Sequence, residues 1–124
     1  MGRVKLGVVG VGTWGQVMLG AWSAHPEAEV VAVCDLDRER SRAAARRYQI
    51  EAAYEDLERF LDHPGLQAVG VATPDFAHRE PVVRSLLAGK HVLVQKPMAT
   101  TVEDCRAMLA AQAESGCYLM VDFQ

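Results

Sequence analysis

The feature that most constrains this chain is a regular alternation between short apolar runs and stretches with helical periodicity. The apolar runs are rich in Val and Ala, have no polar face and are bounded by turn residues. They cover residues 4–9, 30–34, 68–72, 91–94 and 118–121. Strands covered on both faces of a parallel sheet have this composition. The alternation therefore predicts a doubly wound α/β domain, in which helices cover both faces of the sheet.

Three helices are expected between the first run and the run at residues 68–72. The apolar residues of the first stretch recur at helical spacing, which predicts one buried face. They are Trp14, Val17, Met18, Ala21 and Trp22. The second helix should cover residues 38–48 with Asp37 as its N-cap, and the third should cover residues 56–61.

The last two helices are indicated by their end signals. The fourth should end at Gly89, a residue that tolerates the left-handed conformation after a helix. Its inward-facing residues are expected to be Val82, Val83, Leu86 and Leu87. The fifth should begin with a capping box over residues 100–103, with the sequence Thr-Thr-Val-Glu, and end at Gly116.

A short edge strand at residues 52–54 brings the expected count to six strands in two halves of three. The strand order predicted for two such halves is 3-2-1-4-5-6. No linker or repeat divides the sequence, so we expect a single domain over residues 1–124. Because the sixth expected strand, residues 118–121, lies near the end of the sequence, we expect no second domain within these 124 residues. A chain of 124 residues that is 50% hydrophobic can bury a core without a disulfide or a metal.

A glycine motif follows the first apolar run: Gly10-Val11-Gly12-Thr13-Trp14-Gly15. In a G-x-G-x-x-G turn, the first glycine permits the tight turn, the second lets backbone approach a pyrophosphate, and the third lets helix and strand pack closely. The helix tip adds unpaired N–H groups and a partial positive charge. The pattern predicts a dinucleotide site, although a glycine-rich turn can also be only a turn.

Thr13 and Trp14 occupy the two variable positions of the loop and are candidate cofactor contacts. Three placements are open for the Trp14 side chain. It can cover the pyrophosphate, border a substrate cleft or pack against its own helix.

Asp35 follows the second apolar run, 20 residues after Gly15. At this spacing an acidic residue reaches the ribose hydroxyls of adenosine, whereas a 2′-phosphate would be repelled by the same carboxylate. We therefore expect NAD to be preferred over NADP by roughly tenfold or more. The nearby arginines Arg38, Arg40 and Arg42 leave NADP as an alternative if one of them swings toward a 2′-phosphate. A solvated helix face is the simpler interpretation of these arginines.

Polar residues follow the fourth and fifth predicted strands, at the carboxyl edge where open α/β sheets bind ligands. Thr73, Pro74 and His78 follow the fourth strand, and Gln95, Lys96 and Pro97 follow the fifth. Lys96 is a cation that could polarise a carbonyl. A turn former, a helix-start residue and a surface cation are the simpler interpretations of Thr73, His78 and Lys96.

In the order and spacing of these motifs, the chain resembles the N-terminal domain of the glucose–fructose oxidoreductase, inositol dehydrogenase and rhizopine-catabolism (Gfo/Idh/MocA) family. The resemblance covers all 124 positions. Its other motifs are Val33-Cys34-Asp35, Gly89-Lys90-His91-Val92 and Leu119-Met120-Val121. It implies an NAD(P)-binding domain, pyrophosphate contacts at Gly10, Gly12 and Gly15, and a ribose contact at Asp35.

The resemblance further implies cofactor contacts along Thr73-Pro74, at His78 and along Gln95-Lys96-Pro97, with Lys96 as the catalytic residue beside the reacting carbon. It implies an oxidoreductase that transfers a hydride between NAD(P) and an alcohol carbon of a sugar, a polyol or a related substrate. The family's proton-transfer residue comes from a second, substrate-binding domain, so we expect this chain alone to be inactive. One departure is Gln95, where the family usually has Glu. Loss of that carboxylate removes a charge partner of the Lys96 ammonium.

Two alternatives remain open at this stage. A non-catalytic NAD sensor or assembly module would share the glycine loop and Asp35. A methyltransferase-like nucleoside binder would also place glycines after the first strand and an acid after the second, although Gly15 and the Lys96-Pro97 pair argue against it.

Composition excludes several other classes of function. With 13 Lys and Arg against 16 Asp and Glu, the formal net charge is −3, so the chain offers no basic field for nucleic acid. Its apolar runs are too short to cross a membrane. The three cysteines fit no metal-ligand spacing, and we interpret them as free thiols in a cytoplasmic protein. We expect self-association through the edge of the last strand.

Overall fold

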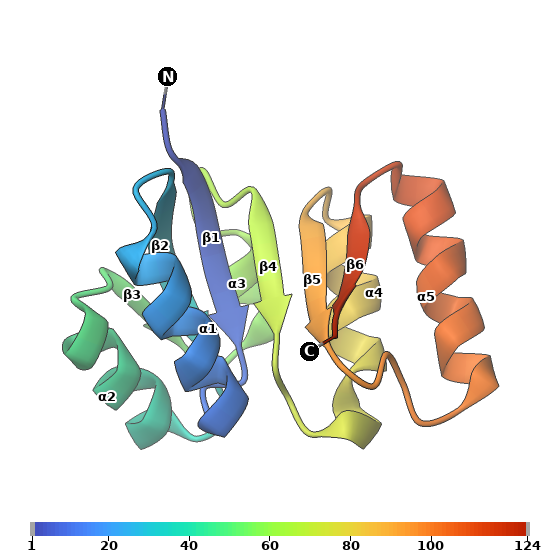
Figure 1. The fold of residues 1–124 in the computed structure, drawn as a ribbon, viewed down its shortest axis with the longest axis horizontal. Coiled ribbons are helices and arrows are strands. Elements are labelled where there is room, and N and C mark those ends of the chain that lie inside the picture. The colour runs from blue at the N-terminus through green and yellow to red at the C-terminus, as the bar shows by residue number, and fades with distance from the viewer. Residues whose placement is uncertain (1, 124) are drawn as a thin grey trace.

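The computed structural model describes residues 2–123, which form one sheet of six parallel strands in the order β3-β2-β1-β4-β5-β6 (Figure 1). The predicted doubly wound fold and strand order are confirmed. In chain order the elements are β1 (Val4–Val9), α1 (Thr13–Ala24), β2 (Ala28–Cys34), α2 (Arg38–Tyr48), β3 (Ala52–Tyr54), α3 (Leu57–Leu61), β4 (Ala68–Val71), the 3₁₀ turn η1 (Asp75–Ala77), α4 (Arg79–Leu87), β5 (His91–Gln95), α5 (Val102–Ser115) and β6 (Leu119–Asp122).

The helices form two layers, one on each face of the sheet. The chain runs outward from β1 to β3 and then from β4 to β6 in the opposite direction. Because parallel crossovers are right-handed, this reversal places the helices of the two halves on opposite faces. Met18 and Leu19 of α1 and Ala44 of α2 accordingly share one core cluster. A second cluster holds residues of the other three helices, Phe60, Leu61, Val82, Leu86, Met108 and Ala111.

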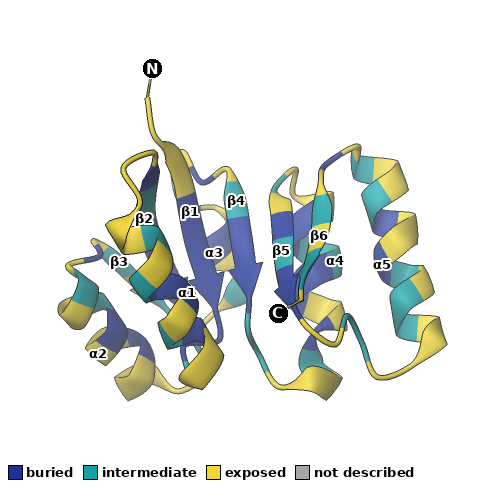
Figure 2. Ribbon diagram, viewed as in Figure 1, coloured by how far each residue is buried: buried dark blue, intermediate teal, exposed yellow. Residues whose placement is uncertain are grey.

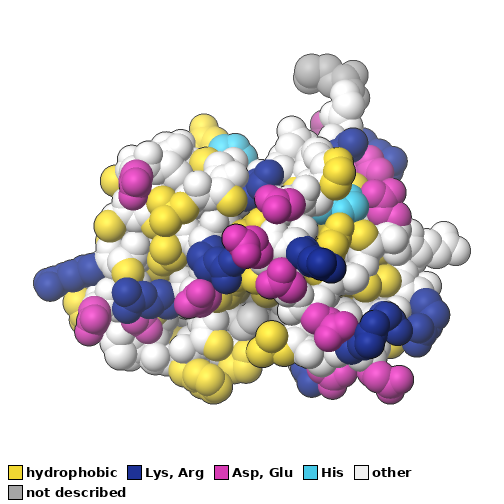
Figure 3. All heavy atoms as spheres, turned by 180° about the vertical axis from the view of Figure 1, so that it is seen from behind, with side chains coloured by type: hydrophobic (Ala, Val, Ile, Leu, Met, Phe, Trp, Pro, Cys, Tyr) yellow, Lys and Arg dark blue, Asp and Glu magenta, His cyan; other side chains and the backbone are white. Residues whose placement is uncertain are grey.

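Burial follows this layering, with buried strand centres between helices whose outer faces are exposed (Figure 2). Seen from behind, the molecule carries acidic and basic side chains that alternate over the surface (Figure 3). Among the ion pairs, Arg79 Nη1 lies 3.1 Å from Asp104 Oδ1, and Arg84 Nη1 lies 3.5 Å from Glu80 Oε1. Across residues 2–123, no helix is both long and apolar enough to span a membrane.

The buried face of α1 agrees with the predicted one only in part. The residues packed on the sheet are Gly15, Met18 and Leu19, whereas Val17 is 55% exposed and Trp14 is 44% exposed. Gly15 also lies on the packed side, where a Cβ would overlap the carbonyl oxygen of Gly10. Met18 and Trp22 of the predicted face pack on the core as expected, whereas the exposure of Trp14 and Val17 contradicts the prediction.

Other helix ends are partly as predicted. Asp37 caps α2 by accepting a hydrogen bond from Arg40 N at 3.1 Å, and Gly116 ends α5 in the left-handed conformation. The capping position of α5 was wrong by one residue, because Thr101 Oγ1, not Thr100, accepts from the N–H of Asp104 at 3.0 Å. On α4, Val82 and Leu86 are buried as expected.

Leu87 is 53% exposed on α4, contrary to the prediction. It is the last residue of the helix. Five strand bounds also shift. β4 ends one residue earlier than predicted, at Val71, and β6 begins one residue later, at Leu119. β2 begins two residues earlier than predicted, at Ala28, while β5 extends to Gln95 and β6 to Asp122.

Candidate functional site

A cleft of about 760 Å³ opens at the carboxyl ends of the strands, where the chain reverses direction between β1 and β4. Open α/β sheets bind ligands at this switch point, and the volume suits a small organic molecule. The cleft is lined by seven of the predicted site residues, namely Gly10, Gly12, Thr13, Trp14, Asp35, Thr73 and Pro74. Segments far apart in the sequence therefore meet in one concavity.

The three glycines of the loop play different physical roles. Gly10 has a φ of +86°, and a Cβ there would lie 2.6 Å from Thr73 N. Gly15 lies against Gly10, as described above. A Cβ on Gly12 would meet only Arg40 Nη1, at an ordinary 3.5 Å. Gly10 and Gly15 are thus required by the protein's own packing. The missing side chain of Gly12 instead keeps the start of α1 accessible from the cleft.

The N-terminus of α1 is also free of competing groups. Gly12 is its N-cap and provides no side-chain hydrogen bond, and no acidic residue lies in the first turn. The N–H groups and the positive end of the helix dipole are therefore available to an anion.

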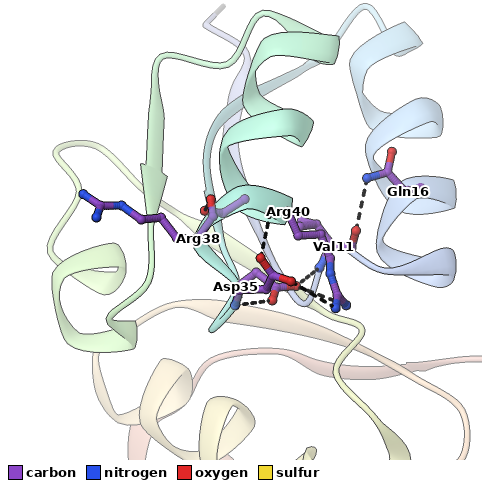
Figure 4. Close-up of polar contacts among 7 residues, drawn as sticks. Val11, Gln16, Asp35, Arg38 and Arg40 are labelled. Atoms are coloured by element: carbon purple, nitrogen blue, oxygen red, sulfur yellow. Dashed lines mark hydrogen bonds and ion pairs between the residues drawn. The ribbon is translucent and has the colours of Figure 1, made fainter.

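Asp35 is fixed at the mouth of the cleft by two backbone N–H groups (Figure 4). Val11 N donates to Oδ2 at 3.0 Å, and Asp37 N donates to Oδ1 at 2.9 Å. The Asp35 backbone N–H donates to Tyr54 O at 3.0 Å, which ties the residue to β3. Each carboxylate oxygen keeps further acceptor capacity. The carboxylate is thus held beside the glycine loop, ready to accept from a ligand's hydroxyl groups.

Two of the three arginines that follow Asp35 have defined partners. Arg40 Nη1 lies 3.9 Å from Asp35 Oδ2, and its Nη2 lies 3.7 Å from Asp37 Oδ2. Arg38 turns away from Asp35 (Figure 4). Its Nε lies 3.1 Å from Glu55 Oε1. Arg40 therefore lines the cleft, which corrects its interpretation as part of a solvated helix face. As the third residue of α2, whose start points to the cleft, it could have been singled out.

The sequence did not indicate the far walls of the cleft. These residues come from the loop after β2, from the start of α3 and from the first turns of α4. They are Leu36, Asp37, Glu55, Asp56, Leu57, Glu80, Pro81 and Arg84. The one local signal was Leu36, an apolar side chain in a polar loop, which is 92% exposed.

The Cys34 side chain is buried at the floor of the cleft. Burial, followed by the negative charges of Asp35 and Asp56, raises the pKa of the Cys34 thiol to about 12. A thiol with this pKa is neutral near pH 7, so Cys34 does not act as a nucleophile. Among the residues described, 2 to 123, no three His, Cys, Asp or Glu side chains gather as a metal site would require.

His78 is buried beneath the loops that follow β4 and β5, with 1% of its surface exposed. One ring nitrogen, Nδ1, lies 2.9 Å from Pro97 O, and the other, Nε2, lies 3.0 Å from Thr73 O. The Thr73 hydroxyl donates to Ala77 O at 3.1 Å and closes the first loop. The ring therefore connects the two loops and faces carbonyl oxygens of the protein.

The remaining predicted residues, Gln95, Lys96 and Pro97, follow the adjacent strand β5 and do not line the cleft. Lys96 and Pro97 are exposed, whereas Gln95 is buried. The predicted site is thus a compact group around the glycine loop and a second group at the end of β5. His78 lies between the two groups and connects them.

Comparison with known proteins gives a match to a family model described as "Oxidoreductase family, NAD-binding Rossmann fold", over residues 4–123. The chain belongs to the Gfo/Idh/MocA family. It is an NAD(P)-binding Rossmann domain of that family, and the methyltransferase-like alternative is wrong.

Relatives of this Gfo/Idh/MocA chain include D-apiose dehydrogenase from Paraburkholderia graminis, 40% identical over 96% of this chain and 32% of that protein. The WlbA dehydrogenase from Bordetella pertussis, solved in complex with NADH and UDP-GlcNAcA, has a TM-score of 0.91 and 31% identity over 97% of this chain and 37% of that one.

A variant of a 3-ketoreductase from Actinomadura kijaniata, solved with TDP-benzene and NADP, has a TM-score of 0.89 and 30% identity. The match covers 97% of this chain and 37% of that one. Both nicotinamide cofactors thus occur among the Gfo/Idh/MocA relatives. The chain spans about a third of the length of the relatives it matches.

Proposed function

We propose that this chain is the dinucleotide-binding domain of an oxidoreductase that transfers a hydride between NAD and an alcohol carbon of a sugar or polyol. The observation that carries the proposal is the Asp35 carboxylate, held by two N–H groups at the mouth of the cleft. In this arrangement Asp35 accepts the hydroxyls of the adenosine ribose. The bare helix tip at Gly12 receives the pyrophosphate.

The group at the end of β5 serves the other end of the cofactor. When bound, the nicotinamide supplies the hydride acceptor or donor at its C4 atom. Thr73 and Pro74 line the way from the glycine loop to the nicotinamide. The exposed Lys96 ammonium stabilises the oxygen on the reacting carbon of the substrate. His78 contributes by holding the two loops together. The relatives are about three times as long, and we infer that a further domain contributes the substrate contacts and the proton-transfer residue.

NAD is the preferred cofactor in this proposal. A 2′-phosphate would meet the Asp35 carboxylate, whose two oxygens are already fixed in position. Arg40 offsets part of this repulsion from 3.9 Å away. It is half-exposed, so solvent screens its contribution. We therefore expect NAD to bind roughly tenfold more tightly than NADP.

Calorimetric titration of the chain with NAD tests the ribose assignment. The Asp35→Ala variant should lose most of its NAD affinity, because the ribose hydroxyls lose a charged acceptor worth about 1.5–3 kcal/mol. Asp62→Ala is the matched control, because it removes an exposed carboxylate outside the cleft and should bind NAD as the wild type does.

The same titrations with NADP test the preference. Asp35→Ala should narrow the gap between the two cofactors, since it removes the repulsion of the 2′-phosphate. Equal NAD affinity in Asp35→Ala and the wild type would refute the proposed role of this carboxylate.

A further inference from the structure

A polar pair at the carboxyl ends of β5 and β6 is not accounted for by cofactor binding. Gln95 and Asp122 are register neighbours on the two parallel strands. Gln95 Nε2 donates to Asp122 Oδ2 at 3.1 Å, and Gln95 Oε1 accepts from the backbone N–H of Lys96 at 3.1 Å. The Gln95 side chain is nearly fully buried, at 4% exposure. Its amide therefore bridges the last strand and the residue proposed to act at the reacting carbon.

The chemistry of both partners fixes the amide in one orientation. A backbone N–H can only donate, so it must face the oxygen of Gln95, and a carboxylate can only accept, so it must face the nitrogen. A carboxylate at position 95 would satisfy the Lys96 N–H but would place a second negative charge against Asp122. Two carboxylates at this distance share a proton. With Asp122 on β6, an amide is therefore the side chain that fits position 95.

The segment that follows is held from both sides. Gln95 anchors its start to β6, and His78 Nδ1 lies 2.9 Å from Pro97 O and 3.2 Å from Met98 O at its other end. Lys96 lies between these anchors with its side chain exposed. The backbone is thus fixed while the ammonium remains free to meet a ligand.

We propose that Asp122 is a positioning residue that acts through Gln95 to fix the Lys96-Pro97 segment at the nicotinamide end of the cofactor site. The inference rests on the proposed function for the location of the nicotinamide. It assigns Asp122 no contact with the cofactor. Lys96 lies within this segment, and His78 lies across the Pro97 carbonyl from it. The β4 side offers Ala72, which does not titrate.

The test is a cycle of Gln95→Glu, Asp122→Asn and the double variant in the full chain. NADH and ADP-ribose are the probes, because ADP-ribose lacks the nicotinamide. At pH 8, Gln95→Glu should weaken NADH binding by about tenfold, since two carboxylates then face each other. It should leave ADP-ribose binding within about twofold of the wild type, because the adenosine end is separate. Asp122→Asn keeps an acceptor oxygen and should cost about twofold, because its hydrogen bond is no longer charge-assisted.

Rescue separates positioning from a general loss of structure. In the double variant the Asn amide at position 122 donates to the Glu carboxylate at position 95, so NADH binding should return to within about threefold of the wild type. Gln95→Glu should also regain NADH affinity as the pH falls from 8 to 5, because the carboxyl pair then retains a shared proton. The facing carboxylates should raise the pKa of the pair in the folded variant. The melting temperature of Gln95→Glu should therefore fall relative to that of the wild type as the pH rises.

Failure of the double variant to rescue, pH-independent behaviour of Gln95→Glu, or an equal loss of ADP-ribose binding would overturn the assignment. If the wild type bound neither probe, the proposed function would fail instead. The melting temperatures of the four proteins would still decide whether Asp122 and Gln95 are coupled.

Discussion

Single residues around the cleft separate demands of the fold from demands of a ligand. Gly10 and Gly15 are small because the protein's own backbone occupies the space that a side chain would fill. Gly12 meets no such obstacle, so packing within the protein does not require its small size. In the proposed function it leaves room for the pyrophosphate. Variants at the two kinds of position should therefore fail in different ways.

Gly12→Ala should keep its fold but lose NAD affinity by roughly tenfold or more, because the new methyl group stands where backbone meets the pyrophosphate. Loss of a glycine N-cap should cost about 1 kcal/mol or less. Gly15→Ala, in contrast, should lose about 3 kcal/mol or more of unfolding free energy, because its methyl group overlaps the Gly10 carbonyl oxygen. Urea unfolding and calorimetry measure the two effects. Unaltered NAD affinity in Gly12→Ala would show that the pyrophosphate lies elsewhere.

The pH dependence of stability tests the buried Cys34 thiol. Its pKa is about 12 in the folded protein, against an ordinary value of 9.0 for the unfolded chain. Because the folded-state pKa is raised, the neutral thiol stabilises the fold below pH 9, and this contribution is lost as the pH rises from 9 toward 12. The unfolding free energy of the wild type should therefore fall by about 1 kcal/mol for each pH unit above 9, relative to Cys34→Ala. Parallel curves for the two proteins would contradict the burial of this thiol.

At the scale of elements, local signals located the helices better than they oriented them. The apolar periodicity of α1 marked the right stretch of chain and placed Met18 correctly, but it missed Leu19 and the close contact of Gly15 with Gly10. Capping shows the same limit, because adjacent threonines precede α5 and only Thr101 caps it.

Substitution of the two threonines distinguishes the capping residue. Thr101→Ala should lower the unfolding free energy by about 1 kcal/mol, since the N–H of Asp104 loses its acceptor. Thr100 is exposed, so Thr100→Ala should change the unfolding free energy by no more than about 0.5 kcal/mol. Urea unfolding of both variants measures the difference. A larger loss from Thr100→Ala would reverse the assignment.

At the scale of the whole molecule, the cleft is a joint product of both halves of the sheet. The first half of the sheet contributes lining residues from the loops after β1, β2 and β3, and the second half contributes them from the loop after β4 and from α4. A ligand that contacts both halves binds the folded state alone, so it should stabilise the entire domain.

NAD at about 100 times its dissociation constant should add about 2.7 kcal/mol to the unfolding free energy. Thermal unfolding with and without NAD measures this gain as a rise in melting temperature. S-adenosylmethionine is the control and should produce no comparable shift, since it lacks the pyrophosphate. An equal shift with both compounds would argue against a dinucleotide site.

The sequence by itself determined the fold class, the strand order and the two ends of the proposed adenosine site. The apolar strands without a polar face indicated a sheet that is covered on both sides. The interval from Gly15 to Asp35 spans one helix and one strand, which placed the two residues at the same edge of the sheet. Such features are local, and they depend on residues close together in the chain.

Tertiary structure decided the rest, because the missing information lies in contacts between distant segments. Only packing shows that α1 contacts Gly10 through Gly15, that Arg40 lies close to Gly12, and that the far cleft wall comes from α3 and α4. It also explains Gln95, a departure from the family pattern in the sequence, because its partner Asp122 is 27 residues away on another strand. The amide of Gln95 donates to the carboxylate of Asp122 only because folding brings the two strands together. No pattern of neighbouring residues in the sequence could indicate this contact.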